Sequence, residues 1–137
     1  MQIDILSLFP EMFAGPLHES MIGNAIENDV INVDVTNFRD FTTDKHNHVD
    51  DYPYGGGAGM LLQLQPIFDA LASVEAKHQA PGCVILLDPS GAQFNLYTAE
   101  DFAQEVQLTS ICGQSEGYAE RMWSLFAVDV SSREYCL

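Results

Sequence analysis

Basic residues are scarce in this chain of 137 residues, which has five Lys and Arg against twenty Asp and Glu. The formal net charge is −15 at pH 7. Proteins bind nucleic acids largely by neutralising phosphates with Lys and Arg, so the overall charge argues against nucleic-acid binding. Two of the five basic residues, Arg39 and Lys45, nevertheless lie close to His46 and His48. This short segment is the part of the chain best suited to contact phosphate.

The same segment leaves two other interpretations open. His46, His48 and Asp50 include metal-ligand types, although alternation along a loop is weak support for a metal site. A solvated polar loop explains the pattern without any ligand, and we favour it over a metal. We therefore expect no metal-binding residues.

Cysteines are few, and their spacing excludes two classes of small protein. Cys83, Cys112 and Cys136 lie far apart and form no CxxC or His/Cys pattern, which argues against a zinc site and against a disulfide framework. Cys83 and Cys112 fall in apolar, strand-like runs, so we expect them to be buried free thiols. Cysteine usage of this kind is typical of the cytoplasm.

Long apolar runs and a basic amino-terminal region are also missing. No run approaches the roughly 18 residues that a membrane span needs. Gln2 and Asp4 stand where a secretory signal would carry positive charge. With 47% hydrophobic residues, the chain has the composition of one globular domain. We expect a cytoplasmic protein that does not contact a membrane.

Several motifs of catalysis and cofactor binding are absent. The chain has no GxGxxG, no P-loop and no GxSxG, which excludes the usual dinucleotide, nucleotide triphosphate and nucleophile-elbow signatures. The sequence indicates no Ser-His-Asp or Cys-His arrangement for nucleophilic catalysis. His18 and His78 have no evident partner in the sequence, so we expect both at the surface.

Apolar runs alternate with segments of helical spacing along the whole chain. This alternation predicts an α/β fold with a mainly parallel sheet flanked by helices. The strands are expected at residues 2–9, 30–35, 84–87, 107–112 and 127–130, and the helices are expected to begin near residues 20, 66, 98 and 118.

Two of the helix starts carry local signals. Ser20 is expected to cap the first helix, and Thr98 with Asp101 resembles a capping box. Residues 88–91 have the residue order of a type I turn. The side chains expected on the buried faces of these two helices are Met21, Ile22, Ala25 and Ile26, and Phe102 and Val106.

Residues 50–60 form the most unusual stretch, with four glycines, two aspartates and two tyrosines. Glycine allows a backbone to approach a partner closely. The stretch lies in an irregular segment of about 36–64, and loops of that length are usually functional or disordered. The tyrosines and aspartates favour a functional loop over a mere connection.

Two strand ends are equipped for binding, because ligands of parallel sheets bind at the carboxyl ends of strands. They are residues 87–91 and 112–117. In the second, Gly113 and Gly117 bracket Glu116, whose carboxylate suits an amine or a ribose hydroxyl. A plain strand-to-helix turn remains the alternative there.

Five segments together resemble the bacterial tRNA (guanine-N1)-methyltransferase family, the TrmD type. They are Ser7–Phe13, Asn37–Phe41, Val49–Met60, Gln65–Ile67 and the stretch from Ile111 to Arg121 that contains Cys112-Gly113 and Glu116-Gly117. They follow the family's order and spread over nearly the whole chain. The resemblance implies a SPOUT-type α/β fold of the trefoil-knot family, a homodimer, and methylation of guanine N1 next to the tRNA anticodon with S-adenosylmethionine.

The resemblance also implies the site residues, which fall into two groups. No residue is expected to be catalytic, because the family's general-base aspartate lies in a region beyond Leu137. The expected cofactor-binding residues are Leu86, Leu87, Pro89, Gly91, Gly113, Ser115, Glu116, Gly117, Ser132, Arg133, Glu134, Tyr135, Cys136 and Leu137. The expected substrate-side residues are Arg39, His46, Asp50, Tyr54, Gly55, Gly56, Gly57 and Gly59.

The chain departs from the family pattern near its C-terminal end. Ser115 stands in place of the usual Tyr, Ala119 replaces Asp, and Arg133 replaces a glycine in the third cofactor loop. We therefore expect residues 1–137 to form a single SPOUT-type domain that is incomplete at its C-terminus, with an incomplete knot and without the family's tRNA-binding domain. The acidic charge and this missing domain weaken tRNA as a partner. We expect the chain alone to be inactive. The alternative is a noncatalytic fragment or pseudoenzyme that at most dimerises or binds S-adenosylmethionine weakly.

Overall fold

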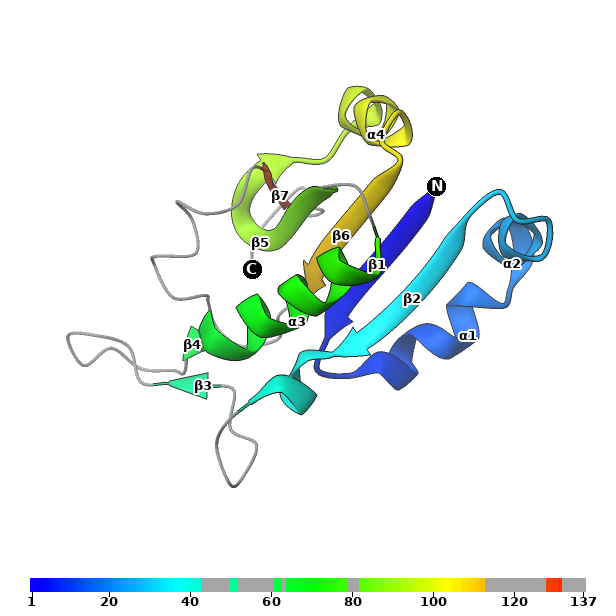
Figure 1. The fold of residues 1–137 in the computed structure, drawn as a ribbon. Coiled ribbons are helices and arrows are strands. Elements are labelled where there is room, and N and C mark those ends of the chain that lie inside the picture. Colours follow the sequence, from blue (N-terminus) through cyan, green and yellow to red (C-terminus); the bar gives the residue numbers. More distant parts are fainter. Residues whose placement is uncertain (43–49, 52–60, 63, 79–81, 113–127, 132–137) are drawn as a thin grey trace.

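The computed structural model describes residues 1–42, 50–51, 61–62, 64–78, 82–112 and 128–131. Its centre is a five-stranded sheet in the order β2-β1-β6-β5-β7, and every neighbouring pair is parallel (Figure 1). The expected α/β fold with a mainly parallel sheet is therefore confirmed. The strands are β1 (Gln2–Ser7), β2 (Asn32–Asn37), β5 (Cys83–Gln93), β6 (Gln107–Cys112) and β7 (Val128–Ser131).

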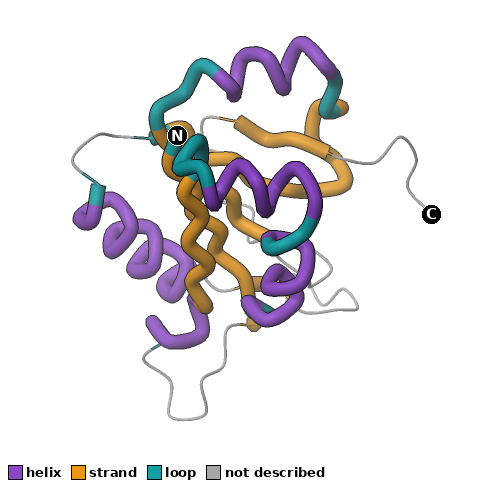
Figure 2. The backbone as a smooth tube through the Cα atoms, turned by 90° about the vertical axis from the view of Figure 1, so that its right-hand side faces the viewer, coloured by secondary structure: helices purple, strands orange, loops and turns teal. Residues whose placement is uncertain are grey.

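Helices cover both faces of this sheet. Figure 2 shows α3 on one side and α1, α2 and α4 on the other. None of the helices in the described part of the chain is both long and apolar enough to cross a membrane. The helices are α1 (Ala14–Leu17), α2 (Ser20–Glu27), α3 (Leu64–Lys77) and α4 (Leu96–Ala103), and the 3-10 helices are η1 (Pro10–Phe13) and η2 (Phe38–Phe41).

The larger core cluster lies between α3 and the sheet. Apolar residues recur along α3 at the spacing of one helix face, so Ile67, Ala70 and Val74 all point to the sheet and are buried. Opposite them lie Leu6, Leu86 and Ile111 from the three central strands β1, β5 and β6, each fully buried. Removing a side chain of this size from water stabilises the fold by about 1.5 to 3 kcal/mol.

A smaller cluster lies on the other face of the sheet. Ile85 and Leu108 are buried there, and Phe102 of α4 packs against them. Phe102 therefore faces inward as expected. Val106, which follows α4, is 76% exposed, so its expected inward position is wrong. The cap of α4 also differs from the expectation, because the side-chain oxygen of Asn95 accepts a hydrogen bond from the Thr98 backbone at 2.9 Å.

The expected buried face of α2 is wrong for its first half, because Met21 and Ile22 are exposed, whereas Ala25 and Ile26 are half-buried. Ser20 is the first residue of the helix, with a positive φ of 52°, and the N-cap position belongs to Glu19. Met21 is 82% exposed, although it was expected on the buried face. The buried residue is Gly23, where a Cβ atom would come within 2.6 Å of the His18 carbonyl oxygen. A helix face can therefore pack closely through a glycine, a contact that a count of apolar residues does not reveal.

A separate two-stranded ladder lies within the long irregular segment. The strands β3 (Asp50–Asp51) and β4 (Leu61–Leu62) pair antiparallel, with Asp51 opposite Leu61. Asp51 and Leu61, which flank residues 52–60, are thereby held next to each other. The helix expected from residue 118 lies outside the described residues.

Candidate functional site

The carboxyl ends of the central strands meet at one edge of the sheet. Ser7 at the end of β1 lies in register with both Asn37 of β2 and Cys112 of β6, and Cys112 is in register with Leu87 of β5. This is the edge at which ligands bind in parallel α/β sheets. Leu87 and Cys112, at the two strand ends that the sequence analysis singled out, are thus brought side by side.

Strand β5 has a step at this edge. Leu87 and Ala92 both pair with Val130 of β7, so residues 88–91 fall between two paired stretches of one strand. The type I turn expected at 88–91 is thus replaced by an irregularity inside β5. Such interruptions re-aim the backbone and are common beside functional sites.

The expected cofactor-binding residues are only partly described. Leu86 is fully buried in the core under α3, so its side chain serves packing. Leu87 and Gly91 are half-buried, and Pro89 lies in the stepped part of β5. The remaining expected cofactor residues lie outside the described residues: Gly113, Ser115, Glu116, Gly117, Ser132, Arg133, Glu134, Tyr135, Cys136 and Leu137.

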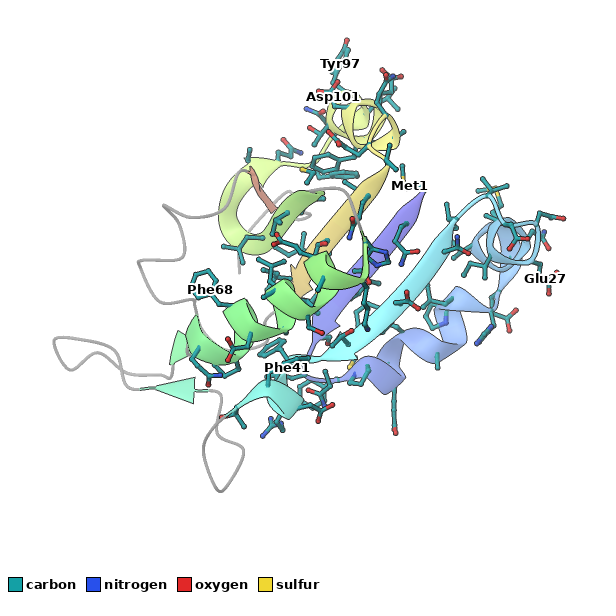
Figure 3. The ribbon with its side chains drawn as sticks, viewed as in Figure 1. Met1, Glu27, Phe41, Phe68, Tyr97 and Asp101 are labelled. Carbon is teal, nitrogen blue, oxygen red and sulfur yellow. The ribbon has the colours of Figure 1, made fainter. Side chains whose placement is uncertain are left out.

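Arg39 is held just beyond the carboxyl end of β2. The Asn37 side-chain oxygen accepts a hydrogen bond from the Arg39 backbone at 3.0 Å, which begins the short helix η2. The neighbouring Phe38 is fully buried, and it anchors this helix to the core. Gln65 of α3 donates a hydrogen bond to the Phe41 carbonyl at 2.7 Å, and Figure 3 shows Phe41 between η2 and α3. The side chain of half-buried Arg39 therefore projects from a backbone that these hydrogen bonds hold in place.

The hairpin β3–β4 brings Asp50, another of the expected substrate-side residues, to the same end of the molecule. Figure 1 shows both short strands beyond the tips of β1, β2 and β6, next to the start of α3. Asp50 lies in β3. The expected residues His46, Tyr54, Gly55, Gly56, Gly57 and Gly59 lie outside the described residues.

The two described cysteines are free, as expected, and half-buried where burial was expected. Burial raises the pKa of the Cys112 thiol at the candidate edge. The pKa of Cys83 is raised by burial and, to a smaller extent, by the negative charge of Glu105. A raised pKa keeps a thiol protonated at neutral pH, and the thiolate is the nucleophilic form. Neither residue is therefore suited to attack a substrate.

A buried polar cluster that the sequence analysis missed lies away from this edge. Asp4 of β1 is only 1% exposed, and its Oδ2 lies 3.0 Å from Nε2 of His78. The expectation that His78 is a partnerless surface residue is therefore wrong. Asp34 of β2 and Gln107 of β6 complete the cluster. An aspartate inside an apolar, strand-like run was the available clue, because carboxylates are seldom buried without a partner.

Comparisons with known proteins identify the family. The family model described as tRNA (Guanine-1)-methyltransferase TrmD matches residues 1–137. This chain belongs to the TrmD family. The chain is 81% identical over its full length to a tRNA (guanine-N(1)-)-methyltransferase of Lactiplantibacillus plantarum and 54% identical to the enzyme of the same name from Enterococcus faecalis. It spans 56% of the length of each of these TrmD relatives.

A solved TrmD structure has the same fold. The crystal structure of tRNA (m1G37) methyltransferase from Aquifex aeolicus superimposes with a TM-score of 0.89 at 26% sequence identity. The match covers all of this chain and 62% of that one. The SPOUT-like fold class expected from the sequence is thereby confirmed. The expected incomplete knot falls on residues outside the described part of the chain.

Proposed function

We propose that this chain provides the cofactor-binding part of an enzyme that methylates guanine N1 in tRNA next to the anticodon, with S-adenosylmethionine as methyl donor. The observation that carries the proposal is the register of Leu87 with Cys112, which sets side by side, at the ligand-binding edge, the two strand ends next to the expected cofactor loops. Membership of the TrmD family supports the same reaction.

The described residues fit such a cofactor. Half-buried Leu87 offers an apolar contact, and the step at 88–91 gives irregular backbone at a strand end. The net charge of −15 also suits a ligand with a positively charged sulfur, because an acidic surface attracts cations. When bound, S-adenosylmethionine would supply an electrophilic methyl group.

The chain's own residues would act by positioning. Methyl transfer needs the acceptor nitrogen in line with the methyl group, and such alignment can supply much of the rate enhancement. Arg39 on its fixed η2 backbone and Asp50 at the hairpin would orient the tRNA side. Guanine N1 carries a proton, so a general base is needed as well. None of these 137 residues matches the family's general-base aspartate, and we therefore propose that the isolated chain does not turn over.

We further propose that residues 1–137 form one domain, and that the active form is a homodimer in the cytoplasm. The continuous sheet supports the first statement, and the family resemblance supports the second. The acidic charge remains an obstacle to tRNA binding by these residues alone, because phosphate contacts need basic side chains.

Two measurements on the purified chain test the proposal. Titration calorimetry with S-adenosylmethionine should show micromolar binding. The Glu116→Gln variant should weaken it by about tenfold to a hundredfold, as expected for losing a hydrogen bond to a charged group. The matched control Glu27→Gln changes an exposed carboxylate at the end of α2 and should bind like the unchanged chain.

A radiolabelled methyl-transfer assay completes the test. It uses a tRNA transcript with guanosine just 3′ of the anticodon and a second transcript with adenosine there. We expect no transfer to either by the isolated chain. Turnover on the guanosine transcript would overturn the proposed inactivity. Absence of cofactor binding would overturn the cofactor role and favour a noncatalytic fragment or pseudoenzyme.

A further inference from the structure

The polar cluster around Asp4 lies under the C-terminal end of α3, near the amino ends of the strands. Asp4 of β1 is in register with Asp34 of β2, so both side chains point to the same face of the sheet. His78 directly follows α3 and reaches the same place. Three segments that are distant in the sequence therefore converge on one point, at the opposite end of the sheet from the candidate functional site.

The distances within the cluster are those of a ligand set. One ligand atom each from Asp4, Asp34 and His78 lies within 4.8 Å of the other two. The separation of 3.0 Å between His78 Nε2 and Asp4 Oδ2 is a few tenths of an ångström below the roughly 3.4 Å between two tetrahedral ligands of one cation with bonds of about 2.1 Å, so binding would move the two side chains slightly apart. Small side-chain movements of exposed Asp34 would bring the third ligand equally close.

Gln107 provides an independent indication that the cluster binds an ion. Its side chain is only 3% exposed, and its Nε2 donates a hydrogen bond to Asp4 Oδ2 over 3.3 Å. Its Oε1 is buried and has no hydrogen-bond partner among the described residues. A buried amide oxygen without a hydrogen-bond partner lowers the stability of the fold by about 1 to 3 kcal/mol. Turning the amide around would place Oε1 next to the Asp4 carboxylate, which is favourable only with a cation between the two oxygens.

The geometry of His78 also indicates that the cluster binds an ion. Its Nε2 is also buried without a well-oriented hydrogen bond, although it lies 3.0 Å from Asp4. A ring nitrogen that faces a carboxylate at poor hydrogen-bond geometry is explained if both atoms bind the same ion. The cluster therefore combines two carboxylates, one imidazole and one unsatisfied amide oxygen. The Gln2 amide also reaches it, because its Nε2 donates to Asp34 Oδ2 at 2.9 Å and to Asp4 Oδ2 at 3.5 Å, so an ion bound between the carboxylates would have to turn or displace this amide.

We propose that Asp4, Asp34 and His78 bind one divalent first-row transition cation, such as Zn²⁺, with the Gln107 carbonyl oxygen as a fourth ligand. An imidazole ligand favours these ions over Mg²⁺ and Ca²⁺, which prefer oxygen alone. Exposed Asp34 leaves the ion a path from solvent. The ion would tie the end of α3 to β1 and β2 and stabilise the fold without taking part in methyl transfer. This differs from our expectation that no residue binds a metal.

The first test measures Zn²⁺ binding to the chelator-treated chain by calorimetry, together with its thermal unfolding. We expect one ion per chain and a higher melting temperature with ZnCl2 than with MgCl2. The Asp34→Asn variant should weaken binding at least tenfold and lose the thermal shift, because an exposed ligand is removed without disturbing the core. The control Asp101→Asn carries the same charge change on α4, at a distance from the cluster (Figure 3), and should behave like the unchanged chain.

A second variant tests the imidazole. His78→Gln keeps a donor for the Asp4 carboxylate, and circular dichroism should show that it folds. We expect it to abolish the visible absorption of bound Co²⁺ that the unchanged chain and Asp101→Asn display. Failure of the unchanged chain to bind Zn²⁺ would overturn the proposal. Binding that both Asp34→Asn and His78→Gln retain would also overturn it, because the ion would then be held by other residues.

Discussion

The sheet face under α3 is built in two different ways along its length. Near the carboxyl ends of the strands, Leu6 and Ile111 pack against the helix and are fully buried. Two residues earlier on the same strands and the same face stand Asp4 and Thr109, equally buried but polar. One helix thus covers an apolar half and a polar half of a single surface.

The two halves stabilise the fold by different kinds of contact. Apolar contacts have no directional requirement, and the apolar half lies directly beneath the candidate functional edge, where it can hold the strand ends rigid. The polar half depends on orientation and charge, since a buried carboxylate is tolerated only with a suitable partner. We therefore expect mutations in the apolar half to act through packing and those in the polar half to act through geometry.

The largest effect should come from the apolar half. Leu6→Ala removes a fully buried side chain from the core under α3 and should lower the free energy of unfolding by about 2 to 5 kcal/mol. Chemical denaturation followed by circular dichroism measures this change. Met21→Ala is the control, because Met21 is 82% exposed and its loss should change stability by no more than about 0.5 kcal/mol. Equal effects of the two variants would contradict the assignment of the core.

A smaller effect is expected at a close contact between Gly82 and Gln107 in the polar half. A Cβ atom at Gly82 would lie 3.0 Å from both the backbone oxygen and the Cγ atom of Gln107. Gly82→Ala should therefore displace Gln107 and lower the free energy of unfolding by about 1 to 3 kcal/mol.

The matched control for this variant is Gly15→Ala. Gly15 lies in α1 with nothing within 4 Å of the added atom. In a helix this change should be neutral or stabilise by up to about 1 kcal/mol. The same denaturation curves measure both variants. If Gly82→Ala were as harmless as Gly15→Ala, the polar half would be looser than its contacts indicate.

The apolar half could be predicted from the sequence, because local pattern determines it. Strand β6 has the expected bounds, since a short apolar run ends at a glycine. Ile67, Phe68, Leu71 and Val74 recur in the sequence at helical spacing, and in α3 Phe68 is half-buried while the other three are buried. The glycine-rich stretch and the two strand ends also led to the TrmD family that the comparisons confirm.

The polar half could not be predicted in the same way, because it depends on contacts between distant segments. His78 and Asp4 are 74 residues apart, and no periodicity links them. The cap of α4 was misplaced for a related reason. Asn95 and Thr98 are both good capping residues, and only the backbone conformation decides that Asn95 caps while Thr98 donates.

The smallest effect is expected on the opposite face of the sheet. Cys112 follows Ile111 on β6 and so points away from α3. Burial raises its pKa, so the folded chain holds the thiol proton more tightly than the unfolded chain does. This stabilisation is fully present below the ordinary thiol pKa of 9.0 and is lost as the pH rises through the raised value. The free energy of unfolding of the unchanged chain should therefore fall more steeply above pH 9.0 than that of Cys112→Ala. Cys83 is retained in both proteins, so its contribution cancels in the comparison. Parallel curves from denaturation at a series of pH values would show that Cys112 is as accessible in the folded chain as in the unfolded one, and that the second face of the sheet is open at its carboxyl edge.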